Sequence, residues 1–468
     1  MAIRFYNSLS RTVEEFVPLK EGEVTLYSCG PTVYNFAHIG NLRAFLFSDL
    51  LKRYLRYRGY RVDHVMNITD VDDKTIRDSK AAGQSLGEFT DYYLAEFIKD
   101  LDTLSVDKAE RMPRATEEIP GMLEMISQLI ESGHAYQVEN GDVYFKVSSF
   151  PSYGELVQLD ASTLKANAGG RLNAADEYDK ENAQDFALWK AYSKDDGNVC
   201  WDAPFGKGRP GWHLECSVMS TKYLGQPFDI HTGGVDLKFP HHTNEIAQSE
   251  CCGPKPFVRY WLHNEHLMVN GKKMSKSEGN FYTLRDLLQK GYDPRPIRLE
   301  LLKTHYRQQL DFREDNLEVN AKTISRLDEC SRLLRGESSS DVDKAGWDDK
   351  LQKFIHDFEV AMDEDLNISE GLAVVLGFVK EVNKAAPELS AAQKTSALLV
   401  LEGFDSVFGL LREEEDVLLD EEIQELIERR ARARKERDFA LADKIRDDLL
   451  DQGIELKDTP EGVKFRRF

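Results

Sequence analysis

The most constraining feature of the sequence is a strand–helix–strand pattern near its start. Residues 24–27 form a short apolar run, and leucine and phenylalanine then recur at three- and four-residue spacing from Leu42 to Leu51. Gly59 ends that helical pattern, and residues 61–69 have the composition of a second buried strand. Two buried strands joined by a helix predict the opening unit of a parallel nucleotide-binding sheet. We therefore expect an α/β fold.

Two short motifs, about 235 residues apart, indicate what such a sheet would bind. The first is AHIGN at residues 37–41, which places an imidazole and a glycine at the expected strand-to-helix turn, where backbone N–H groups and the helix dipole suit a phosphate. The second is KMSKS at residues 273–277, between Gly271 and Gly279. Taken alone, the first is more often an ordinary turn and the second a solvated loop. Together they predict a device that splits ATP at its α-phosphate.

A third group of residues has the chemistry of a metal site. Proline at a first helical position, Pro240, predicts that His241 and Glu245 lie four residues apart on one helix face. Cys29 and Cys216 could complete the coordination of one ion, and this mixture of sulfur, nitrogen and oxygen donors suits Zn²⁺. The four residues lack zinc-finger spacing, so a buried thiol and a capped histidine are the alternative.

Composition limits the class of protein and its surroundings. The net charge of -21 argues against general nucleic-acid coating, so any RNA contact must be local. Six cysteines in 468 residues are too few for a disulfide framework and fit a reducing compartment. No run of residues has the length and hydrophobicity of a membrane span. We expect a cytoplasmic protein with no membrane partner.

The two motifs match the HIGH and KMSKS signatures of class I aminoacyl-tRNA synthetases. Three further stretches resemble cysteinyl-tRNA synthetases: CGPTVY at residues 29–34, GRPGWHLEC at 208–216 and HTGGVDLKFPHH at 231–242. In that family, the residues that match Cys29, Cys216, His241 and Glu245 bind one zinc ion. The resemblance implies that the enzyme activates L-cysteine with Mg²⁺-ATP and transfers it to tRNA(Cys), with zinc selecting the substrate thiolate.

The resemblance also implies roles for the motif residues. The catalytic residues would be His38, Lys273 and Lys276, and ATP would contact His38, Gly40, Asn41 and Lys276. Thr69, Trp212 and Asp236 match positions around the substrate cysteine. Two residues depart from the family pattern. Asn41 replaces the last histidine of HIGH and cannot carry charge, and Glu278 adds negative charge beside the phosphates.

The pattern of elements predicts five segments. Residues 1–115 and 185–310 would form the two halves of a Rossmann-type catalytic core, separated by a connective insertion at 116–184 that contains a hairpin around Asn140 and Gly141. Residues 311–412 would form a helical bundle, and 413–468 a C-terminal module with a charged helix pair and a small hairpin. The family resemblance implies that the bundle binds tRNA and that the C-terminal module binds the anticodon. We expect a monomer.

Two other functions fit parts of the sequence. An adenylating cysteine ligase for an amino sugar, of the mycothiol pathway type, would share the core, but its relatives lack the basic C-terminal module that begins here near Glu421. A zinc-containing RNA-binding protein without activity would have no use for the pyrophosphate clamp formed by His38, Lys273 and Lys276. Cysteine-dependent exchange of ATP and pyrophosphate would distinguish these alternatives.

Overall fold

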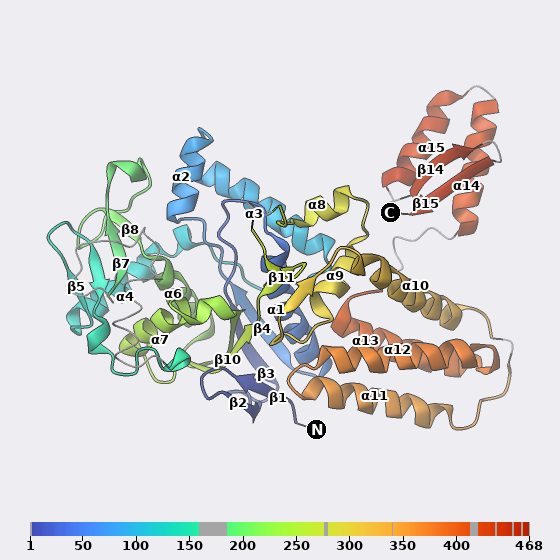
Figure 1. The fold of residues 1–468 in the computed structure, drawn as a ribbon, viewed down its shortest axis with the longest axis horizontal. Coiled ribbons are helices and arrows are strands. Elements are labelled where there is room, and N and C mark those ends of the chain that lie inside the picture. Colours follow the sequence, from blue (N-terminus) through green and yellow to red (C-terminus); the bar gives the residue numbers. More distant parts are fainter. Residues whose placement is uncertain are drawn as a thin grey trace.

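A four-stranded parallel sheet forms the centre of the molecule (Figure 1). In this computed structural model, its strand order is β10-β9-β3-β4, with bounds Val258–Asn264, Phe228–Gly234, Glu23–Ser28 and Arg61–Met66. The described residues are 2–158, 185–275, 279–338, 340–411, 420–435, 438–451, 454–459 and 462–467. All three pairings in this sheet are parallel, so the strands end at the same edge. The predicted α/β opening unit is confirmed.

Helices cover both faces of this sheet, which explains why most residues of its strands are buried. Along β3, Leu26 belongs to the hydrophobic core that α1 (Ile39–Tyr57) shares, whereas Tyr27 belongs to a second core with α6 (Trp212–Leu224) and α7 (His241–Cys252). Alternate side chains of one strand therefore hold different helices against opposite faces. The hairpin of β1 (Arg4–Asn7) and β2 (Thr12–Glu15) packs beside β10.

An antiparallel lobe is inserted between the two halves of the sheet. It follows α2 (Asp73–Ala81), α3 (Leu86–Thr103) and α4 (Ile119–Glu131), and its strands are β5 (Ala135–Gln137), β6 (Val143–Phe145), β7 (Phe186–Ala191) and β8 (Gly208–Pro210), in that order. The predicted hairpin is confirmed as β5 and β6. Strands β7 and β8 pair with this hairpin, so the sheet of the lobe runs to Pro210.

The segment after β10 brings the second motif back to the sheet. Strand β11 (Leu267–Val269) pairs with β12 (Lys272–Lys273) and with β13 (Leu310–Phe312). Between β12 and β13 lie α8 (Leu284–Gln289) and α9 (Pro294–Leu302). The predicted glycine-flanked loop thus begins at the short hairpin of β11 and β12, and β11 directly follows β10 of the central sheet.

The rest of the chain is helical until its last strands. The bundle contains α10 (Asn316–Arg335), α11 (Trp347–Asp363), α12 (Ile368–Ala385) and α13 (Ala391–Phe408), which share one hydrophobic core with α1. A small C-terminal module combines α14 (Asp420–Lys435), α15 (Phe439–Asp451) and the hairpin of β14 (Ile454–Thr459) and β15 (Gly462–Arg467). The predicted helices and terminal hairpin are therefore present, whereas the domain boundaries stay a prediction.

Two residues of the second motif region, Lys276 and Glu278, lie outside the described residues. None of the helices that the structure describes has both the length and the hydrophobicity to cross a bilayer.

A buried ion pair joins the helix after the first motif to the bundle. Arg298 on α9 is 1% exposed and donates to Asp49 Oδ2 on α1 at 2.5 Å. The same guanidinium donates to the carbonyl oxygens of Phe408 at 2.7 Å and Leu104 at 2.8 Å. One side chain thus connects α9, α1, the end of α3 and the end of α13. These contacts offset the cost of burying its charge.

One buried histidine of the sheet predicts how stability depends on pH. His64 on β4 is 2% exposed, its Nε2 lies 2.7 Å from Ser28 Oγ, and burial lowers its pKa to about 3. In the unfolded chain, His64 binds a proton below about pH 6.5, whereas in the folded protein it does so only near pH 3. Acid therefore favours the unfolded chain, so the contribution of the neutral ring to stability is complete above pH 6.5 and is lost as the pH falls toward 3. Between pH 6.5 and 5 we expect the loss to be about 2 kcal/mol.

Urea unfolding of wild type and His64→Gln at pH 5, 6, 7 and 8 measures this contribution. The destabilisation caused by the substitution should shrink as the pH falls, because glutamine does not titrate, whereas the other histidines are common to both proteins. Parallel curves for the two proteins would contradict the assignment.

Candidate active site

A cavity of about 790 Å³ opens at the edge where the parallel strands end. Its wall combines the turn after β3, the start of α1, the ends of β9 and β10, and the beginning of the KMSKS loop. Ligands of open parallel sheets bind at this edge, because loops from neighbouring strands diverge there. Residues from both motifs and from the predicted metal set therefore line one cavity.

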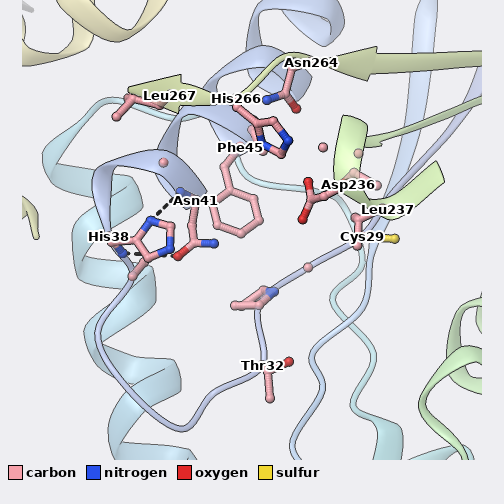
Figure 2. Close-up of a pocket in the computed structure, with 18 of the residues that line it drawn as sticks. Cys29, Thr32, His38, Asn41, Phe45, Asp236, Leu237, Asn264, His266 and Leu267 are labelled. Atoms are coloured by element: carbon pink, nitrogen blue, oxygen red, sulfur yellow. Dashed lines mark hydrogen bonds between the residues drawn. The ribbon is translucent and has the colours of Figure 1, made fainter. Parts of the chain in front are cut away.

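The first motif forms a reciprocal cap at the start of α1. The backbone N–H of Asn41 donates to His38 Nδ1 at 3.1 Å, and the N–H of His38 donates to Asn41 Oδ1 at 3.3 Å (Figure 2). Burial lowers the pKa of His38, so the ring is neutral near pH 7. Because Nδ1 accepts a hydrogen bond, the ring proton is on Nε2, and Asn41 keeps its amide N–H₂ for a ligand. The cap thus fixes the imidazole tautomer.

At Gly40, the absence of a side chain lets Met274 of the second motif lie close to the first motif. A Cβ atom at this position would lie 3.0 Å from His38 Nδ1 and 3.4 Å from Met274 Cε. The Ile39 N–H also donates to the Tyr282 carbonyl oxygen at 3.0 Å, which ties the segment after KMSKS to the start of α1. Lys273 is exposed and lines the cavity, and its contact with phosphates stays a prediction. Lys276 lies outside the described residues.

A tight turn positions Cys29. The Gly30 N–H donates to Asn67 Oδ1 at 2.9 Å, and a Cβ atom at Gly30 would lie 1.7 Å from the Asn67 carbonyl oxygen. Only glycine fits so close to the end of β4. The turn therefore directs Cys29 from the end of β3 toward α6 and α7.

The four predicted metal ligands converge at one side of the cavity. The ligand atoms of Cys29, Cys216, His241 and Glu245 all lie within 4.8 Å of one another. The two sulfur atoms are 3.9 Å apart, and His241 Nε2 lies 3.1 Å from Glu245 Oε1. Residues separated by more than 200 positions thus form one compact donor set.

The unsatisfied atoms of this set fit a metal ion. His241 Nε2 and Glu245 Oε1 are both buried and have no hydrogen-bond partner among the described residues. Burial raises the pKa of the Cys29 and Cys216 thiols and of Glu245, and lowers that of His241, because charge is costly there without an opposite charge. A divalent cation would supply that charge and pair the two unsatisfied atoms. Two sulfur donors with nitrogen and oxygen are a ligand set suited to Zn²⁺.

A second combination of residues shares this space. Ligand atoms of Cys29, His231, His242 and Glu245 also lie within 4.8 Å of one another. However, His231 Nε2 lies 2.9 Å from Glu245 Oε2, and His242 Nε2 lies 3.4 Å from Cys29 Sγ. Both of these nitrogen atoms have hydrogen-bond partners, whereas His241 Nε2 has none in the part of the chain that the structure describes, and this favours the first set.

Further histidines orient the donor set, and sequence reasoning missed most of them. His213 Nδ1 lies 2.7 Å from His241 Nδ1, which leaves His241 Nε2 directed at the donor set. His231 holds one oxygen of Glu245, so the other faces the cysteines. His242, predicted as an orienting residue, lies 3.4 Å from Cys29 Sγ and contacts His263. His213 and His231 lie within the recognised motifs, but only the folded chain shows their partners.

The three residues predicted around the substrate cysteine have different surroundings. Trp212 and Asp236 line the cavity, and the Trp212 ring stacks on His241 with centroids 4.2 Å apart. Thr69 is fully buried, and its hydroxyl donates to Glu215 Oε2 at 2.6 Å. The nearby Asn67, rather than Thr69, is among the residues of the cavity wall. The contact of Thr69 with substrate stays a prediction.

One wall of the cavity carries no recognised motif residue. It consists of Asn264, Glu265, His266, Leu267 and Met268, and Figure 2 shows Asn264 and His266 near each other. No spacing rule marks these residues as a site, because they form the end of β10 and its continuation into β11. Their place at the carboxyl end of a parallel strand is the signal that the sequence offered.

Comparison with known families defines the class. Residues 15–322 match the family described as tRNA synthetases class I (C) catalytic domain, and residues 357–412 match the DALR domain. Among solved structures, a Mycobacterium tuberculosis methionyl-tRNA synthetase in complex with methionyl-adenylate is similar, with a TM-score of 0.59 and 14% identity over 83% of this chain and 90% of that one. At that identity the likeness concerns the fold. The chain has the catalytic domain and the fold of a class I aminoacyl-tRNA synthetase.

Relatives of high identity narrow the class. A cysteine–tRNA ligase of Brachyspira hyodysenteriae is 49% identical over 99% of both chains, and one of Leptospira interrogans is 48% identical over 99% of both. One of Chlamydia muridarum is 46% identical over the full length of both. The chain belongs to the cysteine–tRNA ligase family.

Proposed function

We propose that this protein activates L-cysteine with ATP to cysteinyl-adenylate and transfers the cysteinyl group to the 3′-terminal adenosine of tRNA(Cys). The observation that carries the proposal is the shared cavity: Cys29, Cys216 and His241 of the donor set and the capped His38 turn line the same 790 Å³ space. A thiol-selecting group and a phosphate-binding turn in one cavity support joining a cysteine carboxylate to an α-phosphate.

The chain's own residues would stabilise the adenylation step. As the carboxylate attacks the α-phosphate, negative charge grows on the phosphate oxygens and the leaving pyrophosphate. The neutral His38 would donate from Nε2, and Asn41 from its amide, at the positive end of α1. Lys273 and Lys276 would neutralise the pyrophosphate from the KMSKS loop. Gly40 would let the nucleotide approach the backbone.

We propose that Cys29, Cys216, His241 and Glu245 hold one Zn²⁺ ion. When bound, the metal supplies a soft Lewis acid for the substrate thiolate and can accept a further ligand. Cysteine and serine differ by one atom, so shape alone would separate them by only ~1–3 kcal/mol or less. His213 and His231 would keep the histidine and carboxylate ligands oriented. Selection at binding would then require no editing domain.

The wider biology is part of the same proposal. We propose that Mg²⁺ accompanies ATP, that Trp212, Asp236 and Thr69 surround the substrate cysteine, and that the protein acts as a cytoplasmic monomer. The predicted segments 1–115, 116–184, 185–310, 311–412 and 413–468 would serve as split core, insertion, tRNA-binding bundle and anticodon-binding module. Full-length similarity to cysteine–tRNA ligases does not favour the amino-sugar ligase.

Two linked assays test the function. Purified protein should catalyse ATP–pyrophosphate exchange that depends on cysteine and not on serine, and should then charge tRNA(Cys) but not an amino sugar. Exchange without tRNA charging would favour the amino-sugar ligase. A metal-loaded, folded protein without exchange would exclude both enzymes and leave the RNA-binding alternative.

A further inference from the structure

The Asn264 side chain contains a buried polar atom without a partner on the cavity wall. Asn264 is the last residue of β10 and is 5% exposed. Its Nδ2 donates to the Glu265 carbonyl oxygen at 3.3 Å, whereas its buried Oδ1 accepts no hydrogen bond from any residue that the structure describes. A buried acceptor without a donor is destabilising, so such an atom in a ligand cavity indicates a donor that arrives with the ligand.

The wall that carries Asn264 is held in place from behind. Arg43 on α1 is 2% exposed and donates to the carbonyl oxygens of Glu265 at 2.7 Å and His266 at 2.8 Å. The same guanidinium donates to the Gln308 carbonyl oxygen at 2.6 Å, and the Glu265 N–H donates to the Tyr306 carbonyl oxygen at 2.7 Å. These bonds fix the backbone next to Asn264, so the Asn264 amide is oriented before any ligand binds.

The surroundings of Asn264 indicate which part of the ligand it meets. Leu267 and Met268 continue the wall, and Phe45 of α1 also lines the cavity, so this region presents apolar surface with a few polar atoms. Cys29, Cys216 and His241 occupy the wall assigned to the substrate thiol, and His38 the wall assigned to phosphate. In Figure 2, Asp236 lies between Asn264 and Cys29. The remaining part of an aminoacyl-adenylate is its nucleoside.

We propose that Asn264 is a specificity-determining residue for the adenosine of ATP, whose Oδ1 accepts a hydrogen bond from a ribose hydroxyl or from the exocyclic amine of the base. Arg43 is the positioning residue that holds this acceptor. The proposal rests on the proposed function, because it assigns a contact to the ATP of that reaction. It adds a residue outside the HIGH and KMSKS motifs to the nucleotide site.

Asn264→Ala, studied by cysteine-dependent exchange with several nucleotides, tests this contact. KM for ATP should rise roughly 10-fold, the effect of losing one hydrogen bond, with kcat changed little because the contact is the same in ground and transition states. KM for cysteine should not change. With 2′-deoxy-ATP, 3′-deoxy-ATP and inosine triphosphate, the analogue that lacks the donor should show the same KM in wild type and variant.

The nucleotide whose KM is the same in wild type and in Asn264→Ala lacks the group that donates to Asn264. If this nucleotide is a deoxy analogue, the donor is a ribose hydroxyl, and if it is inosine triphosphate, the donor is the exocyclic amine. If, for every analogue, KM relative to that for ATP is increased as much in the variant as in wild type, the proposal is overturned. A rise in KM for cysteine alone would also overturn it. Asn320→Ala is the matched control, because Asn320 of α10 is 4% exposed and donates to the Pro296 carbonyl oxygen and to Glu300 Oε2 of α9. It should leave KM for ATP unchanged.

Wild-type kinetics keep the proposal testable if Asn264→Ala does not fold. The wild-type protein should discriminate against one of the three analogues by roughly 10-fold or more in kcat/KM, because a site that pairs a donor rejects a ligand without it. Equal use of ATP and all three analogues would overturn the Asn264 assignment while leaving the exchange activity intact. Absence of wild-type exchange would instead contradict the proposed function.

Discussion

Cys216→Ser is expected to lose both the bound zinc and the activation of cysteine. Cys216 is buried, and its sulfur lies 3.9 Å from Cys29 Sγ in the donor set. A serine hydroxyl is a harder and weaker ligand for Zn²⁺ than a thiolate. Changes to residues that only orient metal ligands already cost about 10–100-fold. Loss of a ligand should therefore lower cysteine-dependent exchange by at least roughly 100-fold.

Metal content and exchange must be measured on the same preparation. Elemental analysis should give about one zinc per chain for wild type and well below that for Cys216→Ser. Cys330→Ser is the matched control, since Cys330 is equally buried but lies in α10 within the bundle. Full zinc content with normal exchange in Cys216→Ser would show that the ligand assignment is wrong.

The same measurement separates the two overlapping donor sets. If Cys29, His231, His242 and Glu245 were the ligands, Cys216→Ser would keep its zinc. His241→Gln removes a ligand only from the set with Cys216, so it should also release zinc. Retention of zinc by both variants would identify the alternative set.

His38→Ala is expected to lower the rate of adenylation by roughly 100-fold, because one preorganised donor to the developing phosphate charge is lost. The substitution has a second effect that the structure makes separable. His38 Nδ1 also accepts the Asn41 N–H at the start of α1, so alanine removes the helix cap and should lower the free energy of unfolding by about 1 kcal/mol.

His38→Asn distinguishes the two roles. Asparagine is a good N-cap residue, so this variant should keep wild-type stability in urea unfolding, yet it lacks the Nε2 donor and should remain as slow as His38→Ala in exchange. Ser85→Ala provides a control for cap loss alone, because Ser85 caps α3 and does not line the cavity. Near-normal exchange in His38→Asn would mean that His38 acts through the cap and not on phosphate.

Local patterns carried much of the fold. The apolar run before AHIGN, the three- and four-residue spacing after it and the Asn140-Gly141 turn each specify an element through interactions within a few residues, and the structure contains all three. The sequence did not show which strands pair with one another. The composition of residues 185–210 does not reveal whether they join the central sheet or the inserted lobe, because an apolar strand fits either.

The candidate site divides in the same way. Cys29, Cys216, His241 and Glu245 were found because their chemistry is distinctive within recognisable motifs, although their metal and their roles stay predictions. Asn264 and Arg43 were not found, because a buried amide without a partner and a guanidinium bonded to four carbonyl groups exist only after folding.

The sequence by itself determined the chemical groups available and the order of the elements, since residue identity and short-range periodicity are properties of the chain. Only the tertiary structure decided which groups meet. Parallel strands end at one edge, so residues from β3, α1, α6, α7 and β10 line one cavity despite separations of more than 200 positions. Burial then decided which atoms lost water and found no partner, and these atoms mark where ligands would bind.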